Sequence, residues 1–165
     1  MLDSRGLVFE GRDHLDQDKR PFALSETEMR RFGFDPGRHY DLEAIVRHVA
    51  PTVLVGTSAI PGAFTEGAVR EMAARAPRPI VLPLSNPTAN SEATPAEVLA
   101  WSDGRALVAT GSPFAPVEVN GRARPVGQAN NVLVFPGIGL GAIVARYRLC
   151  VAISLHRGLR KIERT

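Results

Sequence analysis

The sequence is poor in cysteine and in long apolar runs. Cys150 is its single cysteine, which excludes an internal disulfide and favours a reducing compartment. The longest apolar stretch, 132–145, is interrupted by Pro136 and closed by Arg146, so it is too short for a membrane-spanning helix. The first residues lack the basic, apolar and small-residue order of a signal peptide. We therefore expect a cytoplasmic protein without a membrane partner.

Lysine is also rare: the chain contains only Lys19 and Lys161, and arginine carries most of its positive charge. The formal net charge is a mild +3, and 44% of the residues are hydrophobic, which indicates one soluble globular domain. Cations gather mainly towards the C-terminus, where they suit the negative end of a helix dipole. We expect no nucleic-acid partner, because that function requires charge clustered on one face. The cluster comprises Arg146, Arg148, Arg157, Arg160, Lys161 and Arg164.

Strand and helix signals alternate along the chain and predict an α/β fold. Apolar runs at 52–56, 79–84 and 106–111 are predicted strands, and the first is typical of a strand buried on both faces. Short strands separated by helices indicate a parallel sheet. Capping residues mark the helix starts. These residues are Ser25 with Glu28, Asp41, Thr65, and Thr94 with Pro95 and Glu97. The helix that Thr65 starts is predicted to end at about Ala76.

The two ends of the chain give further expectations. Residues 6–12 are predicted to form a short strand or hairpin arm, and the polar residues 13–24 a loop. Residues 130–162 are predicted to form a long, largely apolar helix with an irregular start. The letters GIGLGA at 137–142 match a phosphate-binding fingerprint, but only 23 residues follow Ala142. That is too few for a return strand, so we favour glycines that allow close helix packing or a bent helix start.

Three polar loops are expected at one edge of the sheet, where ligands collect in such folds: 56–62, 84–88 and 110–114. Asn86 lies in the second loop, and an amide can bind a carboxylate, a hydroxyl or a nicotinamide amide. Asn before Pro is also a common turn dipeptide, and Asn130 or Asn131 could equally cap the last helix. Asp3 could end a strand and bind ribose, or occupy a simple turn. The four histidines show no metal-site spacing.

Five segments, in this order, resemble the cofactor-binding domain of malic enzymes, which oxidise malate with NAD or NADP and Mg or Mn and release pyruvate and carbon dioxide. The resemblance implies an incomplete Rossmann-like doubly wound parallel sheet over residues 1–148, without its first strand and glycine-rich turn. It also implies a divergent or truncated helical tail over 149–165. The segments are LDSRGLVFEGR (2–12), PTVLVGTSAIPGAFTEGAVREMA (51–73), RPIVLPLSNPTANSEATPAEV (78–98), GRALVATGSPFAPV (104–117) and VGQANNVLVFPGIGLGAIVAR (126–146).

The resemblance also implies site residues. Asp3 would meet the adenosine ribose, and Ser4 with a cation at Lys19 or Arg20 would accept the 2′-phosphate of NADP. The loop beside the nicotinamide ribose would consist of Gly56, Thr57, Ser58 and Ala59. Asn86 and Asn130 would contact malate, with Asn86 and Asn131 also beside the cofactor.

Other parts of the family's site are not matched here: a catalytic tyrosine and lysine, three metal carboxylates and the glycine-rich fingerprint. We therefore expect neither catalytic residues nor metal ligands in this chain, which resembles the latter part of a malic enzyme. It would be inactive alone and would need the missing N-terminal part, with malate and pyruvate as ligands and a homo-oligomer as the complete assembly. The alternative is a non-catalytic binding or regulatory module that pairs with a full-length malic enzyme. A different dehydrogenase is disfavoured, because SNPT and GQANN occur together in the expected order.

Overall fold

The computed structural model of the chain describes residues 1–130, 133, 136 and 140. The chain divides into two compact units, Met1–Ala129 and Asn130–Thr165. The predicted C-terminal helix and the predicted boundary at residue 148 lie outside the described residues. The following description therefore concerns the first unit.

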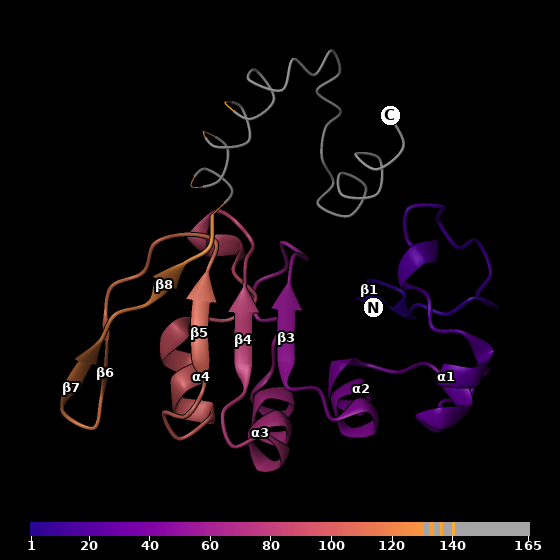
Figure 1. Cartoon of the computed structure of the whole chain (residues 1–165), viewed down its shortest axis with the longest axis horizontal. Coiled ribbons are helices and arrows are strands. Elements are labelled where there is room, and N and C mark those ends of the chain that lie inside the picture. Colours follow the sequence, from indigo (N-terminus) through magenta and orange to yellow (C-terminus); the bar gives the residue numbers. More distant parts are fainter. Residues whose placement is uncertain (131–132, 134–135, 137–139, 141–165) are drawn as a thin grey trace. The chain divides into compact units, whose positions relative to one another are not determined.

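A parallel sheet is the centre of this unit (Figure 1). It consists of β3 (Val53–Gly56), β4 (Ile80–Pro83), β5 (Leu107–Thr110) and β8 (Gly127–Gln128), in that spatial order. The first three confirm the predicted strands. The fourth was not predicted, because a two-residue strand is too short to show a hydrophobic period.

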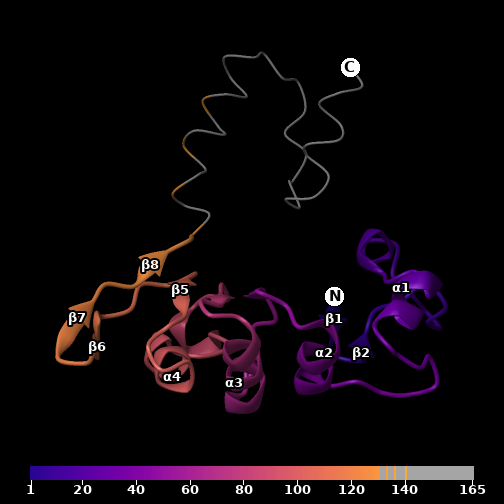
Figure 2. The same cartoon turned by 60° about the horizontal axis from the view of Figure 1, so that its bottom comes forward.

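Helices α2 (Leu42–Val49), α3 (Glu66–Arg75) and α4 (Pro95–Trp101) lie against one face of the sheet (Figures 1 and 2). Their predicted N-caps are confirmed. The side chains of Asp41, Thr65 and Thr94 each accept a hydrogen bond from the backbone N–H three residues later. Such a bond satisfies one of the N–H groups left without a partner at a helix start.

The core lies between these helices and the sheet. Val81 of β4 is fully buried in one cluster with Val69 of α3 and Val98 of α4. Leu54 of β3 packs against Val46 of α2 and other residues of a second cluster. Burying branched side chains of this size stabilises the fold by about 1.5–3 kcal/mol each.

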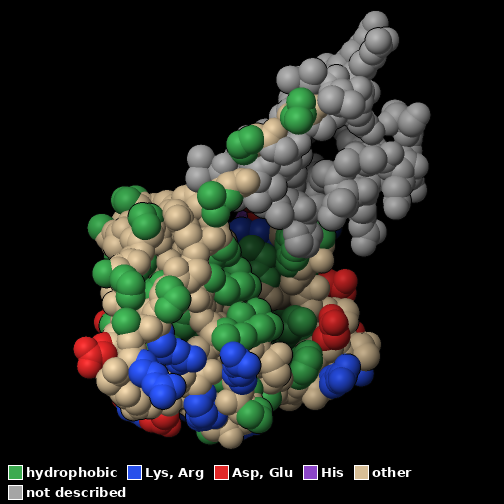
Figure 3. Space-filling model, turned by 60° about the vertical axis from the view of Figure 1, so that its left-hand side comes forward, with side chains coloured by type: hydrophobic (Ala, Val, Ile, Leu, Met, Phe, Trp, Pro, Cys, Tyr) green, Lys and Arg blue, Asp and Glu red, His purple; other side chains and the backbone are tan. Residues whose placement is uncertain are grey.

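The opposite face of the sheet is open. Val53, Val55 and Leu107 remain 44%, 53% and 39% exposed, so the expectation that β3 is buried on both faces is wrong. The reason is that the described helices pack on one face only, whereas a doubly wound sheet requires them on both. Apolar side chains also form a group on the molecular surface in Figure 3.

The N-terminal part has its own small core. Strands β1 (Leu2–Asp3) and β2 (Gly6–Leu7) form a hairpin, in which β2 begins the strand or hairpin arm predicted at 6–12. A 3₁₀ turn, η1 (Arg20–Phe22), lies within the predicted loop. Helix α1 (Glu26–Arg31) begins with the predicted capping box of Ser25 and Glu28. The core side chains are Leu7, Met29, Phe34 and Tyr40.

Between β5 and β8 the chain makes an antiparallel hairpin, β6 (Val117–Val119) and β7 (Arg122–Arg124). Asn120 and Gly121 at its tip both have positive φ, 54° and 71°, as a two-residue hairpin turn of this type requires. A short 3₁₀ turn, η2 (Thr88–Asn90), follows β4. Among the described residues, no helix is long and apolar enough to cross a membrane.

Candidate functional site

The predicted loops follow β3, β4 and β5 at the carboxyl edge of the sheet, above the arrowheads in Figure 1. The parallel register places the end of β3 beside the end of β4, with Gly56 opposite Pro83. The N–H of Leu84 donates to the carbonyl of Gly56 over 2.9 Å and extends this pairing into the loops. The first two loops therefore leave the sheet side by side.

Glu92 connects the first two loops. Its side chain is buried, with the residue only 1% exposed, and its Oε1 accepts from the N–H of Ser58 at 2.7 Å and from the Ser58 hydroxyl at 2.9 Å. The Ser85 hydroxyl also donates to Oε1 and itself accepts from the N–H of Ala59 at 2.9 Å. One carboxylate thus binds groups from the ends of two strands.

This arrangement requires glycine at the end of β3. A Cβ atom on Gly56 would lie 2.6 Å from Cδ of Glu92, far inside van der Waals contact. Gly56 is a predicted cofactor contact, and in the structure it makes room for the carboxylate. Its role in the fold is therefore to allow this close approach.

The hydrogen bonds also determine the ionisation of Glu92. Burial alone would raise the pKa of this carboxyl, but the bonds from Ser85 and from the Ser58 backbone and hydroxyl outweigh burial and lower the pKa. The group is consequently an anion at neutral pH. Charge-assisted hydrogen bonds of this kind are stronger than those between neutral groups.

Asn86, the predicted malate and cofactor contact, is exposed in the second loop. Its Oδ1 accepts from the hydroxyl of Ser112 over 2.6 Å, and its Nδ2 donates to the carbonyl of Leu84 over 3.4 Å. The peptide bond to Pro87 is cis. The second and third loops are therefore joined through Asn86, whose amide has one fixed orientation.

Gly111 permits this junction. A Cβ atom there would lie 2.1 Å from the carbonyl oxygen of Leu84 and 3.0 Å from Nδ2 of Asn86. The hydroxyl of Thr110 donates to the carbonyl of Ser112 over 2.8 Å and shapes the same turn. The loop after β5 can therefore approach Asn86 only because residue 111 has no side chain.

The first loop contains three further predicted cofactor contacts, which differ in whether their side chains are hydrogen-bonded within the protein. Thr57, Ser58 and Ala59 are exposed, but the Ser58 hydroxyl donates to Glu92 and accepts from the N–H of Ile60 at 3.2 Å. Ala59 has a φ of 56°, in the left-handed region that favours glycine. The Ser58 hydroxyl is therefore engaged in hydrogen bonds within the protein.

Asp3, the predicted ribose ligand, ends β1 and forms two ion pairs. Arg12 donates to both carboxylate oxygens, at 2.8 and 3.1 Å, and Nζ of Lys19 lies 2.6 Å from Oδ2. Burial opposes ionisation of Asp3, but Lys19, Arg12 and the N–H of Arg5 hold its pKa well below the usual range. Arg12 and Lys19 thus both lie beside Asp3, whereas Ser4 and Arg20 are exposed. The predicted role of Ser4 with Lys19 or Arg20 on a 2′-phosphate stays a prediction.

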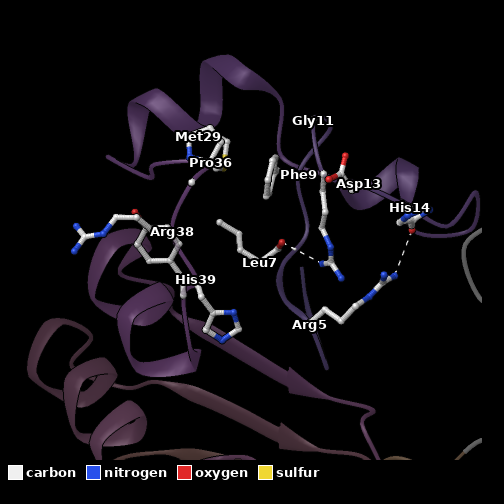
Figure 4. A pocket seen from close by; sticks show the side chains of 13 residues that line it. Arg5, Leu7, Phe9, Gly11, Asp13, His14, Met29, Pro36, Arg38 and His39 are labelled. Atoms are coloured by element: carbon white, nitrogen blue, oxygen red, sulfur yellow. Dashed lines mark hydrogen bonds between the residues drawn. The ribbon is translucent and has the colours of Figure 1, made fainter.

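A cavity of about 430 Å³ lies on the other side of Arg12, between the N-terminal hairpin, α1 and residues 36–40 (Figure 4). Leu7 and Phe9 point into it, Arg5 lies at its edge, and Arg38 extends away. Arg12 itself donates to the carbonyls of Gly6 and Leu7. The sequence did not predict this cavity, and its open, mixed lining does not define a ligand.

Two further predicted contacts, Asn130 and Asn131, belong to the second unit. Asn130 begins the second compact unit, and Asn131 lies outside the described residues. Their roles therefore stay predictions. Within the described part of the chain, no group of three or more His, Cys, Asp or Glu residues is arranged to hold a metal ion.

Sequence reasoning missed the residues that hold the site together: Arg12, Ser85, Glu92 and Ser112. Glu92 lies 34 residues from Ser58 along the chain, and Ser112 lies 26 residues from Asn86. No local period relates residues so far apart. The only available signal was a single carboxylate in the polar segment between β4 and α4.

Comparison with known proteins agrees with this architecture. Residues 1–158 match the family described as malic enzyme, NAD binding domain. The chain belongs to the malic enzyme family. The malic enzyme resemblance inferred from the sequence is thus confirmed, as is the coarser prediction of a Rossmann-like NAD-binding domain with a parallel sheet.

Several malic enzymes are similar over most of the chain. The NAD-dependent malic enzyme 3 of Bacillus subtilis is 48% identical over 149 residues, which is 90% of this chain and 26% of that protein. A putative NAD malate oxidoreductase of Mycobacterium tuberculosis is 46% identical over 161 residues, 98% of this chain and 29% of that protein. The NAD-dependent malic enzyme of Pseudomonas aeruginosa is 44% identical over 146 residues, 88% of this chain and 26% of that protein. The chain thus spans little more than a quarter of these relatives.

Proposed function

We propose that the chain is the cofactor-binding part of a malic enzyme that oxidises malate with NAD and releases pyruvate and carbon dioxide. The observation that carries this proposal is the membership of the malic enzyme family together with the exposed amide of Asn86 at the carboxyl edge of the sheet. Alone, the chain is inactive, because a hydride transfer needs substrate and cofactor in one fixed geometry. The complete enzyme is a cytoplasmic homo-oligomer.

Each group at this edge has a task that fits its chemistry. Ser112 occupies Oδ1 of Asn86, so Nδ2 is the end of the amide that donates to a carboxylate or carbonyl oxygen of malate or to the cofactor. The backbone of Thr57 to Ala59 borders the nicotinamide ribose. A bound nicotinamide ring supplies the hydride acceptor. The described side chains bind and orient ligands, and the acid–base groups come from the remaining part of the enzyme.

NAD is the preferred cofactor, with Asp3 beside the adenosine ribose. The two cations on Asp3 balance its charge, so repulsion of a 2′-phosphate is weaker than at an isolated carboxylate, and NADP is the second cofactor to assay. Mg or Mn is needed by the complete enzyme. The described residues do not form a fitting ligand set, and no step of the reaction is assigned to a metal on them.

The open face of the sheet is where the rest of the enzyme docks. Val53 and Val55 are exposed on this face of β3, and exposed apolar side chains favour burial against another protein surface. β3 is also an end strand of the described sheet, and an unpaired strand backbone favours pairing with another chain segment. The same surface suits the alternative, a regulatory module that binds a full-length malic enzyme without taking part in catalysis.

The test is to mix the chain with the part of the Bacillus subtilis relative that precedes the matched segment; this mixture is termed the reconstituted enzyme. Reduction of NAD or NADP is followed with malate and Mn²⁺. We expect malate-dependent reduction by the mixture and none by either part. Activity of the chain alone would overturn the fragment proposal, and a stable but inactive complex would favour the regulatory module.

A further inference from the structure

We propose that Glu92 is a positioning residue, which holds the loops after β3 and β4 as one unit and so sets the orientation of Asn86. The inference rests on the proposed function for its effect on turnover, but its structural basis is independent of any ligand. It assigns a role to a buried anion that is not itself a predicted ligand contact but binds Ser58, which is one.

The geometry shows why both loops depend on this carboxylate. Oε1 accepts from the backbone and hydroxyl of Ser58 and from the hydroxyl of Ser85, and the N–H of Ser85 lies 3.4 Å from Oε2. The backbone of Glu92 adds a further contact, because its carbonyl accepts from the N–H of Phe64 over 3.0 Å. Glu92 thus contacts both ends of the 57–64 loop and the first residue beyond Leu84.

The third loop joins the same network through Asn86. Ser85 precedes Asn86 directly, and Ser112 binds Oδ1 of Asn86 over 2.6 Å. A shift of Ser85 therefore changes the position of Asn86 relative to Ser112. Since a displacement of about 1 Å can cost a large factor in rate, such a shift affects turnover without a direct contact to the substrate.

The acceptor oxygens of the carboxylate matter as well as its volume. Three donors converge on Oε1, and buried donors left without an acceptor cost about 1–3 kcal/mol each. Glutamine keeps the acceptor and the volume but turns an N–H group towards the N–H of Ser85. Alanine removes both side-chain acceptor oxygens and leaves a cavity beside Gly56. The two substitutions therefore separate partial from complete loss of the contact.

The first experiment is amide hydrogen exchange on the full chain, with Glu92→Ala, Glu92→Gln and the control Glu97→Ala. In Glu92→Ala we expect the amides of Ser58, Ala59 and Ser85 to exchange at least about tenfold faster together. The amide of Val81 in β4 should keep its rate, and Glu92→Gln should recover most of the protection. Glu97→Ala loses a helix-capping bond instead and should leave the three loop amides unchanged.

Two exchange results would overturn the proposal. One is faster exchange at Ser58 without a change at Ser85, which would show that the loops are not coupled. The other is an equal increase at Val81, which would mean that Glu92 supports the whole domain rather than the loops. Because these measurements need no ligand, they remain decisive even if the reconstituted enzyme has no activity.

The second experiment follows turnover in the reconstituted enzyme. We expect Glu92→Ala to lower kcat by at least about tenfold while the affinity between the two parts stays the same, and Glu92→Gln to restore most of it. A raised KM with unchanged kcat, or no rescue by glutamine, would argue against positioning. Absence of activity in the wild-type mixture would instead contradict the proposed function. The exchange experiment would still test whether Glu92 couples the two loops.

Discussion

The hydroxyl of Ser112 donates to Oδ1 of Asn86 over 2.6 Å and joins the loop after β5 to the loop after β4. This bond gives Asn86 a fixed direction, in which the amide nitrogen donates one hydrogen to the carbonyl of Leu84 and has a second hydrogen to donate. An aspartate at the same position would have no donor in its ionised form. The direction of the amide is therefore the property on which malate binding is expected to depend.

Replacing Asn86 with alanine should damage turnover far more than folding. We expect kcat/KM for malate in the reconstituted enzyme to fall at least about tenfold, because a hydrogen bond to a charged group contributes about 1.5–3 kcal/mol. The melting temperature of the chain should stay nearly constant, since the side chain is exposed. Unchanged kinetics would return Asn86 to the role of a turn residue.

Thr94 lies in the same polar segment as Asn86, and its replacement should lower stability without lowering turnover. Its side chain caps α4 in a reciprocal pair with Glu97, so Thr94→Ala should lower the free energy of unfolding by about 1 kcal/mol. Denaturant unfolding measures this loss. Ligand affinity should not change, and a loss of turnover as large as that of Asn86→Ala would contradict the division between the two residues.

Gly111→Ala should disrupt the site where the loop after β5 meets the loop after β4. The new methyl would lie 2.1 Å from the carbonyl oxygen of Leu84, so both strand ends must move, and we expect a loss of about 1–3 kcal/mol in unfolding free energy. Gly11→Ala is the control, because its nearest neighbour, in Phe9, would be 3.7 Å away. Equal stability of the two variants would show that the loops have more room than the structure indicates.

The ion pairs of Asp3 should make stability depend on pH in the acid range. The pKa of Asp3 is lower in the folded chain than its ordinary value of 3.8, so its stabilising contribution is full above that value and is lost as the pH falls through the folded pKa. Asp3→Asn should cost about 2 kcal/mol at neutral pH, with a smaller cost below about pH 4.

Urea unfolding of the wild type and of Asp3→Asn across pH 2.5–7, about the range in which carboxylates titrate, measures this difference. Asp13→Asn, an exposed carboxylate in the same segment, controls for the general loss of one negative charge. A difference between wild type and Asp3→Asn that grows as the pH falls would contradict the assignment.

The open sheet face should matter for assembly and not for folding of the chain. Val55 is 53% exposed, so Val55→Asn should change the free energy of unfolding by no more than about 0.5 kcal/mol. In contrast, it should weaken association with the preceding part of the enzyme, measured by titration calorimetry. Val81→Ala, at a fully buried position, should instead destabilise the chain by about 2 kcal/mol. If Val55→Asn associates as tightly as the wild type, this face is not the docking surface.

Much of the secondary structure follows from local chemistry. Helix starts at Ser25, Asp41, Thr65 and Thr94 were predictable because a capping side chain acts over three residues. Three strands were predictable because apolar β-branched runs are long enough to show a pattern. The exposure of Val55 was not, since the apolar run is the same whether one face or both are covered.

The sequence by itself determined the α/β class, the starts of helices α1 to α4, the strands β3 to β5, the malic enzyme resemblance and the candidate Asn86. Only the tertiary structure revealed that Lys19 and Arg12 both bind Asp3, that Ser58 binds Glu92, and that Ser112 orients Asn86. Local patterns arise from neighbours within a few residues along the chain. The contacts of the site join residues brought together by strand register and helix packing, and that geometry exists only in the folded protein.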